Sequence, residues 1–396
     1  MPTIDPGNRA WIWLVALASF GLLLVSGCGR PADKEAVLKV GVLAPLTGPF
    51  AANGTAMVQS LEMAATDINQ RGGVLGRQVV LVTADTQGKA DSARAEALNL
   101  MDRERVWALI GAYLSEETFA IQEVAADRQK LLIVPIAATN ELTARVGSDY
   151  PRYKYVFRVA YNIDQWSRLL GDYLASRGVK NYAFAGTNIR WNKELAGTLQ
   201  DYLASRGINN VYTDYYSPQN PVMDSLILAL KEKKPELVVV GDPGRNSVEF
   251  VKKAQDLALE APLLSVGGAL GDARVASTLN PRGGLYFQGV TWRGHTPAAT
   301  RYFEKFSQQY KYLPVGYGDT LPYDALQVLA QAADKAGSLE ADKVVQALET
   351  GAFEGIAGVY RFDATHQATW GSQGSLPGVV VRWKDGKDEV VWPVKP

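Results

Sequence analysis

The chain has 396 residues, which is long for one compact domain and sufficient for two. Its 41 lysines and arginines equal its 41 aspartates and glutamates, and this balance argues against a nucleic-acid partner, whose phosphates require an excess of positive charge. One cysteine and two histidines exclude an internal disulfide and a multi-cysteine metal site. We therefore expect neither a metal nor any other cofactor.

The first residues have the pattern of an export signal. An apolar run over residues 10–25 follows Arg9 and ends in Val25-Ser26-Gly27-Cys28. A basic residue, an apolar stretch and small residues before a cleavage point are typical of a secretory signal peptide. The lone cysteine at the end of this run resembles a bacterial lipobox, and the resemblance implies that lipid on Cys28 anchors the protein to a membrane.

We accordingly expect a signal peptide over residues 1–27 and a lipidated tether over residues 28–36. The folded part would then face the periplasm or the extracellular side of the cell envelope. The alternative is an uncleaved helical anchor, because the apolar run approaches the length that spans a bilayer.

Beyond the tether, expected strands and helices alternate. Residues 37–43 form a β-branched apolar run, which is typical of a buried strand. Residues 55–70 repeat apolar side chains at the helical spacing, and the glycines at 72 and 73 favour a helix end there. The alternation continues at 78–83, 90–103, 106–110, 115–128 and 131–135.

A second block repeats the same architecture. Its expected elements lie at 166–177, 182–185, 193–206, 211–215, 223–233, 237–240, 247–257 and 263–266. Strands and helices that alternate at this spacing build a parallel sheet with helices on both faces. We predict an α/β protein with two doubly wound, Rossmann-like lobes.

Several segments resemble the type I periplasmic binding proteins, in the same order along the chain. They include KVGVLAPLTG at 39–48, ATDINQRGGVLG at 65–76, Asp85, Ile110-Gly111 with Ser115, VPIAATNELT at 134–143, FEGIAG at 353–358 and Phe362-Asp363. Within that family the chain is most similar to the leucine/isoleucine/valine-binding proteins that feed ABC importers.

The resemblance implies two lobes joined by three crossovers that close on a ligand by hinge motion. Matching segments place lobe one at 37–157 plus 291–360 and lobe two at 158–290 plus 361–396, with extra strands at 379–383 and 389–392. The implied function is capture of a small solute, an amino acid or related carboxylate, for permease subunits of an ABC importer. The alternative is a ligand-sensing periplasmic receptor of the same fold that signals to a partner protein and binds an amide or organic acid.

Candidate ligand-binding residues in lobe one follow the ends of two strands. Ligands of open α/β sheets bind at the carboxyl ends of the strands, where loops lead into helices. The resemblance implies that the Ser115 and Thr139 hydroxyls contact an α-carboxylate, that the Ala137 carbonyl accepts from an α-ammonium, and that Ala138 lies beside them. The alternative for both hydroxyls is simple capping of the helices that follow them.

Lobe two is expected to supply an aromatic and an acidic group. Trp191 falls where the family often has an aromatic that covers the ligand, although it can also pack at the surface or the hinge. The branched-chain binders pair the ammonium with an acid at a position that is Gly268 here, and glycine has no charge. Asp242, after the expected strand at 237–240, is the nearest substitute and is equally a turn former.

Three further positions bear on the ligand. Asn53, in the first loop, is expected to face the side-chain pocket, and Tyr113 is a candidate wall or simply a core residue. Glu116 and Glu117 replace the small residues usual at their positions and would repel a carboxylate if they pointed inward.

A catalytic site is not expected. Catalysis would require a nucleophile with a base, a carboxylate pair or a metal. Ser265 lacks the glycine pattern of a nucleophile elbow, residues 267–271 lack the dinucleotide fingerprint, and both histidines lie in stretches that read as solvated loops. We therefore predict a binding protein, with a periplasmic hydrolase as the less favoured alternative.

Overall fold

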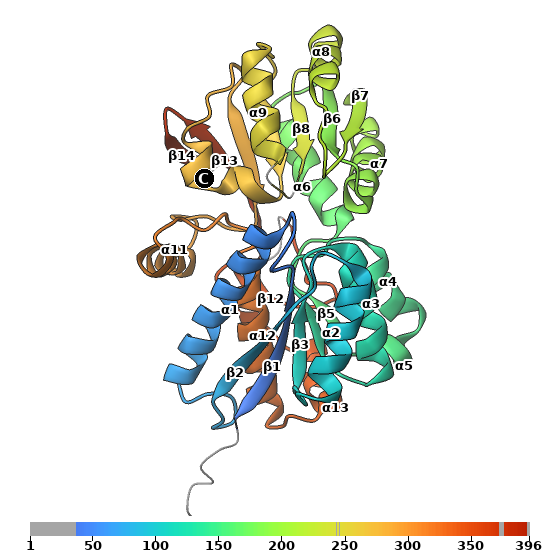
Figure 1. The fold of residues 1–396 in the computed structure, drawn as a ribbon, viewed down its shortest axis with the longest axis vertical. Helices are drawn as coiled ribbons and strands as arrows, with labels where there is room; N and C mark the ends of the chain where they lie inside the picture. Colours follow the sequence, from blue (N-terminus) through green and yellow to red (C-terminus); the bar gives the residue numbers. More distant parts are fainter. Residues whose placement is uncertain (1–36, 243, 245, 372–375, 394–396) are drawn as a thin grey trace, which may run out of the picture. The chain divides into compact units, whose positions relative to one another are not determined.

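The computed structural model describes residues 37–242, 244, 246–371 and 376–393. The predicted signal peptide, the tether and Cys28 lie outside the described residues. The described chain forms two mainly parallel sheets with helices packed on their faces, which confirms the predicted fold class (Figure 1).

The first sheet has five parallel strands in the order β2-β1-β3-β4-β5. Its elements are β1 (Leu38–Ala44), α1 (Ala51–Gln70), β2 (Val79–Asp85), α2 (Ala90–Asp102), β3 (Ala108–Gly111), α3 (Ser115–Asp127), β4 (Leu132–Val134), α4 (Glu141–Ser148), α5 (Tyr150–Tyr153) and β5 (Val156–Arg158). After β1 the chain adds β2 on one side of β1, and it then adds β3, β4 and β5 on the opposite side. The strand order therefore reverses between β1 and β3, where open α/β sheets bind ligands.

The second sheet has seven strands in the order β14-β13-β10-β9-β8-β6-β7. Its first elements are α6 (Ile163–Ser176), β6 (Asn181–Thr187), α7 (Arg190–Ala204), β7 (Asn209–Tyr216), α8 (Asp224–Lys233), β8 (Val238–Gly241) and α9 (Asn246–Asp256). They are followed by β9 (Leu263–Val266), the 3₁₀ helix η1 (Gly268–Gly271), α10 (Ala273–Ala276) and β10 (Leu285–Gly289). Here the order reverses between β6 and β8, so α7 begins at the second switch point.

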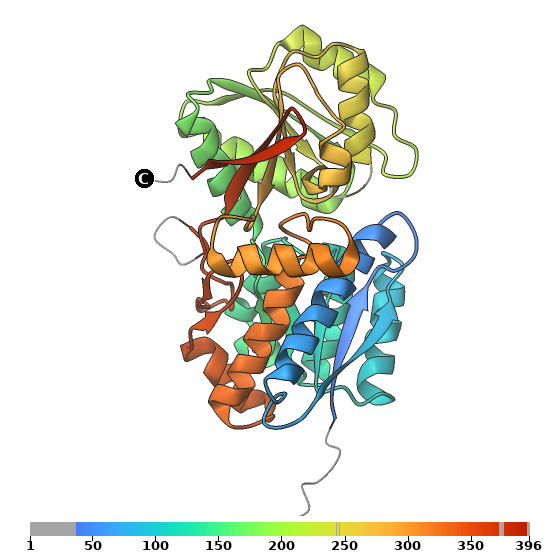
Figure 2. The same ribbon diagram turned by 90° about the vertical axis from the view of Figure 1, so that its left-hand side faces the viewer.

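The chain then returns to the first sheet. Its elements are α11 (Pro297–Tyr310), α12 (Leu321–Ala336), α13 (Ala341–Thr350) and a small hairpin of β11 (Phe353–Glu354) and β12 (Val359–Tyr360). Both views show α12 beside α1 (Figure 1, Figure 2). Arg71 at the end of α1 donates to Gln327 of α12 at 2.7 Å, which ties these distant segments together.

The C-terminal strands complete the second sheet. β13 (Val379–Lys384) pairs antiparallel with β10, and β14 (Lys387–Trp392) pairs with β13, as the extra strands at 379–383 and 389–392 predicted. They cover the edge that β10 would otherwise expose.

One predicted boundary is wrong in detail. Residues 361–371 were assigned to lobe two, yet this stretch lies along β5 of the first sheet. The Arg158 N–H donates to the His366 carbonyl at 3.0 Å, and the Ala368 N–H donates to the Arg158 carbonyl at 2.9 Å. His366, expected in a solvated loop, is buried with its ring stacked on Phe157 at 3.9 Å. The short edge strand β5 thus gains the backbone partners that its sheet does not supply.

Candidate ligand-binding site

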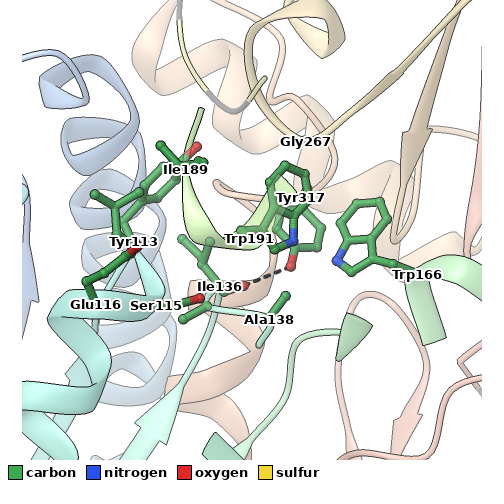
Figure 3. A pocket seen from close by; sticks show the side chains of 12 residues that line it. Tyr113, Ser115, Glu116, Ile136, Ala138, Trp166, Ile189, Trp191, Gly267 and Tyr317 are labelled. Atoms are coloured by element: carbon green, nitrogen blue, oxygen red, sulfur yellow. Dashed lines mark hydrogen bonds between the residues drawn. The ribbon is translucent and has the colours of Figure 1, made fainter. Parts of the chain in front are cut away.

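One pocket is lined by loops from both sheets. The empty space among its side chains is about 460 Å³, and this volume includes solvent at the open mouth of the pocket. Its lining residues are Tyr113, Leu114, Ser115, Glu116, Ile136, Ala137, Ala138, Trp166, Ile189, Trp191, Gly267 and Tyr317. Figure 3 shows the side chains converging from the two sheets. Of the predicted ligand-binding residues, the pocket brings together Tyr113, Ser115, Ala137, Ala138 and Trp191.

The N-terminus of α3 forms one end of this pocket. Ser115 is the first helical residue and Leu114 is the N-cap, so the Ser115 side chain does not cap the helix. Helix geometry leaves the N–H groups of residues 115–117 without an acceptor inside the helix. The Ser115 side chain is buried against the pocket and has no hydrogen bond within the described chain. This end of the pocket therefore offers donors to an incoming anion.

Of the two acidic residues on this turn, Glu117 is directed away from the pocket. Its carboxylate accepts from the Leu114 N–H at 2.8 Å and from the Thr86 hydroxyl. Burial raises the pKa of Glu117, and these two hydrogen bonds oppose the rise. Glu116 lines the pocket and is exposed to solvent. The predicted repulsion of a carboxylate therefore concerns Glu116 alone.

Arg158 holds the loop between β4 and α4 that forms the pocket wall. Its guanidinium is fully buried and donates to the Thr139 carbonyl at 2.6 Å and to the Ala137 carbonyl at 3.3 Å. It also donates to Gln367 at 2.5 Å and to Thr143 at 2.9 Å. Burial lowers the pKa of Arg158 to about 9. The Ala137 carbonyl, which the resemblance implied for an ammonium, thus already accepts from a cation.

Thr139 is buried but does not line the pocket. Its hydroxyl donates to one oxygen of Glu194, on α7, at 2.5 Å. The other oxygen of Glu194 accepts from Arg190 at 2.6 Å, and Arg190 also donates to Glu141 of α4 at 2.5 Å. The Thr139 hydroxyl thus joins a polar contact between helices that belong to different sheets, and it does not face the pocket.

Aromatic rings form the opposite wall. Trp166, which is fully buried, lies 4.9 Å from Tyr317 and 6.1 Å from Trp191 between ring centroids. The Tyr317 hydroxyl donates to the Ile136 carbonyl at 2.9 Å (Figure 3). Burial raises the pKa of Tyr317, an effect that the neighbouring Trp166 N–H and Arg158 partly offset. The Trp166 indole N–H faces the Tyr317 hydroxyl and is closed off from solvent.

Two further predicted residues, Asp242 and Asn53, lie off the pocket. Asp242 is buried and accepts from the Tyr216 hydroxyl at 2.6 Å and from the Gly244 N–H at 2.7 Å, which fits its reading as a turn former. Burial raises the pKa of Asp242 to about 6. Asn53 lies in the first turn of α1, and Gly268 begins η1 beside the lining residue Gly267. Asn53 does not line the pocket.

Comparison with known proteins decides the family. Residues 37–387 match the family model described as periplasmic binding protein. The chain belongs to the periplasmic binding protein family. This confirms the resemblance inferred from its motifs, and because the family consists of binding proteins, the chain is not an enzyme.

Individual relatives agree with this assignment. The chain is 26% identical over 358 residues to a Leu/Ile/Val-binding protein of Rhizobium johnstonii, covering 89% of this chain and 93% of that protein. A Streptococcus pneumoniae substrate-binding protein of a branched-chain amino acid transporter, in complex with isoleucine, superposes with a TM-score of 0.76 at 21% identity, covering 90% and 99% of the two chains. A Rhodopseudomonas palustris ABC transporter solute-binding protein, in complex with benzoate, gives a TM-score of 0.78 at 21% identity, covering 90% and 95%.

Apart from Glu116, six lining residues of this periplasmic binding protein were not predicted as ligand-binding residues: Leu114, Ile136, Trp166, Ile189, Gly267 and Tyr317. Ile189 lies two residues before Trp191, and Gly267 lies directly before Gly268, so both are within two residues of a predicted position. Trp166 lies on the buried face of α6, so its sequence pattern indicates a core residue. Tyr317 lies in an irregular stretch without the hydrophobic periodicity that predicts a helix or a strand.

Within the described ranges, no three His, Cys, Asp or Glu side chains lie close enough together to hold a metal ion. No helix in the same ranges is both long and apolar enough to cross a membrane. The apolar run at 10–25 lies outside them.

Proposed function

We propose that this periplasmic binding protein captures a small carboxylate-bearing solute, from the class that includes amino acids and other organic acids, and delivers it to an ABC importer. One observation carries the proposal. The start of α3, with the unbonded Ser115 hydroxyl and the free N–H groups of residues 115–117, opens into a pocket lined from both sheets.

The electrostatics of the pocket support a carboxylate at this end. A helix N-terminus carries the equivalent of roughly half a positive charge, and its N–H groups point at whatever lies beyond it. Glu117 accepts from the Leu114 N–H at 2.8 Å and does not line the pocket, so it leaves that space open. The exposed carboxylate of Glu116 opposes a bound anion only weakly, because solvent screens it.

Contacts across the two sheets support capture by closure. The Thr139–Glu194 hydrogen bond and the Arg190–Glu141 ion pair connect the first sheet's β4–α4 region to α7. We expect these contacts to form when the lobes close on a ligand and to break when they open.

The relatives share this ligand chemistry. Similar solved structures hold leucine, isoleucine, benzoate and 3,4-dihydroxybenzoic acid, all of which carry a carboxyl group. Transport is supported by the role of these similar proteins, which are solute-binding or substrate-binding proteins of ABC transporters. Attachment to the membrane rests on the lipobox-like Cys28.

Ligand capture is tested by thermal shift and calorimetric titration with a panel of amino acids, carboxylic acids and their amides. We expect acids to raise the melting temperature and the matching amides to have no effect. Ser115→Ala should weaken binding by about tenfold or more, because a hydrogen bond to a charged group is worth about 1.5–3 kcal/mol. Thr66→Ala, whose hydroxyl bonds within α1, is the matched control. A panel in which no acid binds, or in which amides bind equally well, would overturn the proposal.

Transport and anchoring need separate measurements. Purification of the full-length protein from solubilised membranes should recover ABC permease subunits, whereas recovery of a signalling protein instead would favour the sensor role.

Lipid anchoring is tested by the variant Cys28→Ala. This variant should move the protein from the membrane fraction to the soluble fraction. Retention of this variant in the membrane would contradict lipid anchoring and favour a helical anchor.

A further inference from the structure

We propose that the pole of the first lobe at which the described chain begins docks on an anionic lipid surface. Six residues that line an open hollow at this pole carry the argument, and we call them the basal patch: Val37, Lys39, Arg77, Glu104, Arg105 and Trp107. The inference rests on the proposed lipid anchor at Cys28 and goes beyond it, because an anchor alone does not fix the orientation of the folded part.

The basal patch lies at the edge of the first sheet opposite to the pocket. Val37 precedes β1, Arg77 precedes β2 and Arg105 precedes β3, so all three lie at the starts of parallel strands. The pocket lies beyond the ends of β3 and β4, where Ser115 and Ala137 are found. Both views show the start of β1 at the end of the first lobe that points away from the second sheet (Figure 1, Figure 2). A lipid surface at this pole would therefore leave the pocket open to its solute.

The basal patch carries a surplus of positive charge. Its one acid, Glu104, pairs with Lys39 at 2.8 Å. Arg77 and Arg105 are exposed, and within the described residues their guanidinium groups form no ion pair and no hydrogen bond. Guanidinium groups bind phosphate oxygens through paired N–H donors. The patch thus matches the phosphates of an anionic lipid in charge and in hydrogen bonding.

Helix stability does not explain these two arginines. A cation in the last turn of a helix offsets the negative end of the helix dipole. Arg77, however, pairs with Val74 in a bridge before β2, and Arg105 lies two residues beyond the C-cap of α2. Acids in neighbouring turns are already paired with other cations: Asp102 with Arg128, Glu340 with Lys343 and Asp342 with Lys154. An external anion is the partner that these observations leave for the basal patch.

Apolar side chains in the same hollow suit the interface of a bilayer. Val37 is 48% exposed. Trp107 is partly buried, and its indole N–H donates to the Leu339 carbonyl at 2.8 Å. Tryptophan is enriched at the level of the lipid headgroups, and basic side chains beside apolar ones favour binding in the plane of the interface. The basal patch combines these two kinds of group.

The tether keeps this pole close to the membrane. Val37 is the ninth residue after Cys28, and nine residues span at most about 30 Å when fully extended. Electrostatic attraction acts over a Debye length of about 10 Å at roughly 0.1 M salt. Because the anchor makes the second contact intramolecular, cations that bind a membrane only weakly by themselves suffice to dock the anchored protein.

A fluorescent label on the anchored, full-length protein tests the docking. The lone native cysteine is the proposed lipid site, so an introduced thiol can be labelled uniquely. Gln78→Cys places the label beside the basal patch, and Glu232→Cys places it on α8, at the opposite end of the molecule (Figure 1). Each protein is reconstituted into vesicles that contain a quencher on the lipid headgroup. The vesicles are made of phosphatidylcholine alone or with an equal part of phosphatidylglycerol.

We expect phosphatidylglycerol to increase quenching of the Gln78→Cys label by about twofold or more at low salt, and high salt to reverse the increase. Quenching of the Glu232→Cys label should be the same in both vesicles. Equal quenching of the Gln78→Cys label in both vesicles would overturn this inference while leaving the lipid anchor intact. A protein that enters neither kind of vesicle would overturn both.

Two double variants assign the docking to the basal patch. Arg77→Gln with Arg105→Gln removes both free cations, and each lost cation should lower the ratio of docked to undocked protein by about fivefold. Quenching of the Gln78→Cys label with phosphatidylglycerol should then fall to its level in phosphatidylcholine. Arg168→Gln with Arg301→Gln, at exposed positions of α6 and α11, loses the same charge and should change nothing. Equal losses in the two double variants would show an effect of net charge alone and would overturn the inference.

Discussion

The two lobes supply different chemistry to one pocket. The first sheet contributes a helix N-terminus, a serine hydroxyl and a loop whose carbonyls Arg158 holds in place. The second sheet contributes Trp191 and Ile189 from the start of α7, and Trp166 comes from α6. The helix N-terminus and the serine hydroxyl of the pocket thus come from the first sheet, whereas the second sheet contributes mainly apolar side chains. Because α3 and α7 each begin at the switch point of their sheet, the same topology positions both kinds of group.

Arg158 and Asp242 are buried charged residues of different lobes, and they differ in the groups that they hold in place. Arg158 donates to four groups and fixes the loop that carries Ala137 and Thr139. Asp242 accepts from Tyr216 and Gly244 and fixes a turn off the pocket. Loss of the first should therefore disturb binding, and loss of the second should not. The predictions below run from the largest expected effect on affinity to the smallest.

Arg158→Met should have the largest effect. It leaves the Thr139 carbonyl and Gln367 without their donor, and buried unsatisfied groups cost about 1–3 kcal/mol each, so the free energy of unfolding should fall by about 3 kcal/mol or more. Ligand affinity should fall as the loop loosens. Chemical denaturation and calorimetry measure the two effects. Arg168→Met, on the exposed side of α6, is the control and should change stability by less than about 0.5 kcal/mol.

Trp191→Ala should be next. Removing a ring from a binding pocket costs about 2–3 kcal/mol of affinity, because apolar contact area and ring packing are lost together. Trp191 is only half-buried, so the fold should survive, and an unchanged melting temperature of the free protein checks this. An unchanged dissociation constant would show that Trp191 packs against the protein and does not contact the ligand.

Thr139→Val should weaken ligand binding by about 1 kcal/mol, because it removes the hydrogen bond to Glu194 without changing the side-chain volume. A double-mutant cycle with Glu194→Gln separates this contact from other effects, and the two changes should be non-additive. Strict additivity would show that the contact between the two sheets contributes nothing to ligand binding.

Asp242→Asn should change affinity by less than about twofold, since the side chain does not line the pocket. Its effect should appear in stability against pH. Burial raises the pKa of Asp242 from 3.8 to about 6, so the native state holds this proton more tightly than the unfolded state. The stability that the proton contributes is complete below about pH 4 and is lost as the pH rises through about 6.

Urea denaturation of both proteins from pH 4 to pH 8 measures this. The difference in the free energy of unfolding between the native protein and Asp242→Asn should change between about pH 4 and 6 and be constant above pH 7. Asp319 and Asp324, whose pKa values burial also raises, titrate in both proteins and cancel in the difference. A difference that does not vary with pH would contradict the burial of Asp242.

The elements with a clear period were predictable, and the shortest ones were not. The helix expected at 55–70 is present as α1, which begins four residues earlier at Ala51. By contrast, β5 has three residues and α5 has four, too few to show any period. The boundary error at 361–371 has the same cause, since this stretch is held by individual backbone hydrogen bonds to Arg158.

The amino-acid sequence alone determined the α/β class, the two-lobe architecture and the position of Ser115, Ala137 and Trp191 after the ends of strands. These features are predictable because hydrophobic periodicity and turn residues are local properties of the chain. Only the tertiary structure decided which polar groups remain free. Glu194 accepts from the Thr139 hydroxyl across 55 positions of the sequence, and Arg158 donates to the Ala137 carbonyl. Hydrogen-bond partners of buried groups depend on packing between distant segments, so the charge that the pocket accepts follows from the fold and not from the motif.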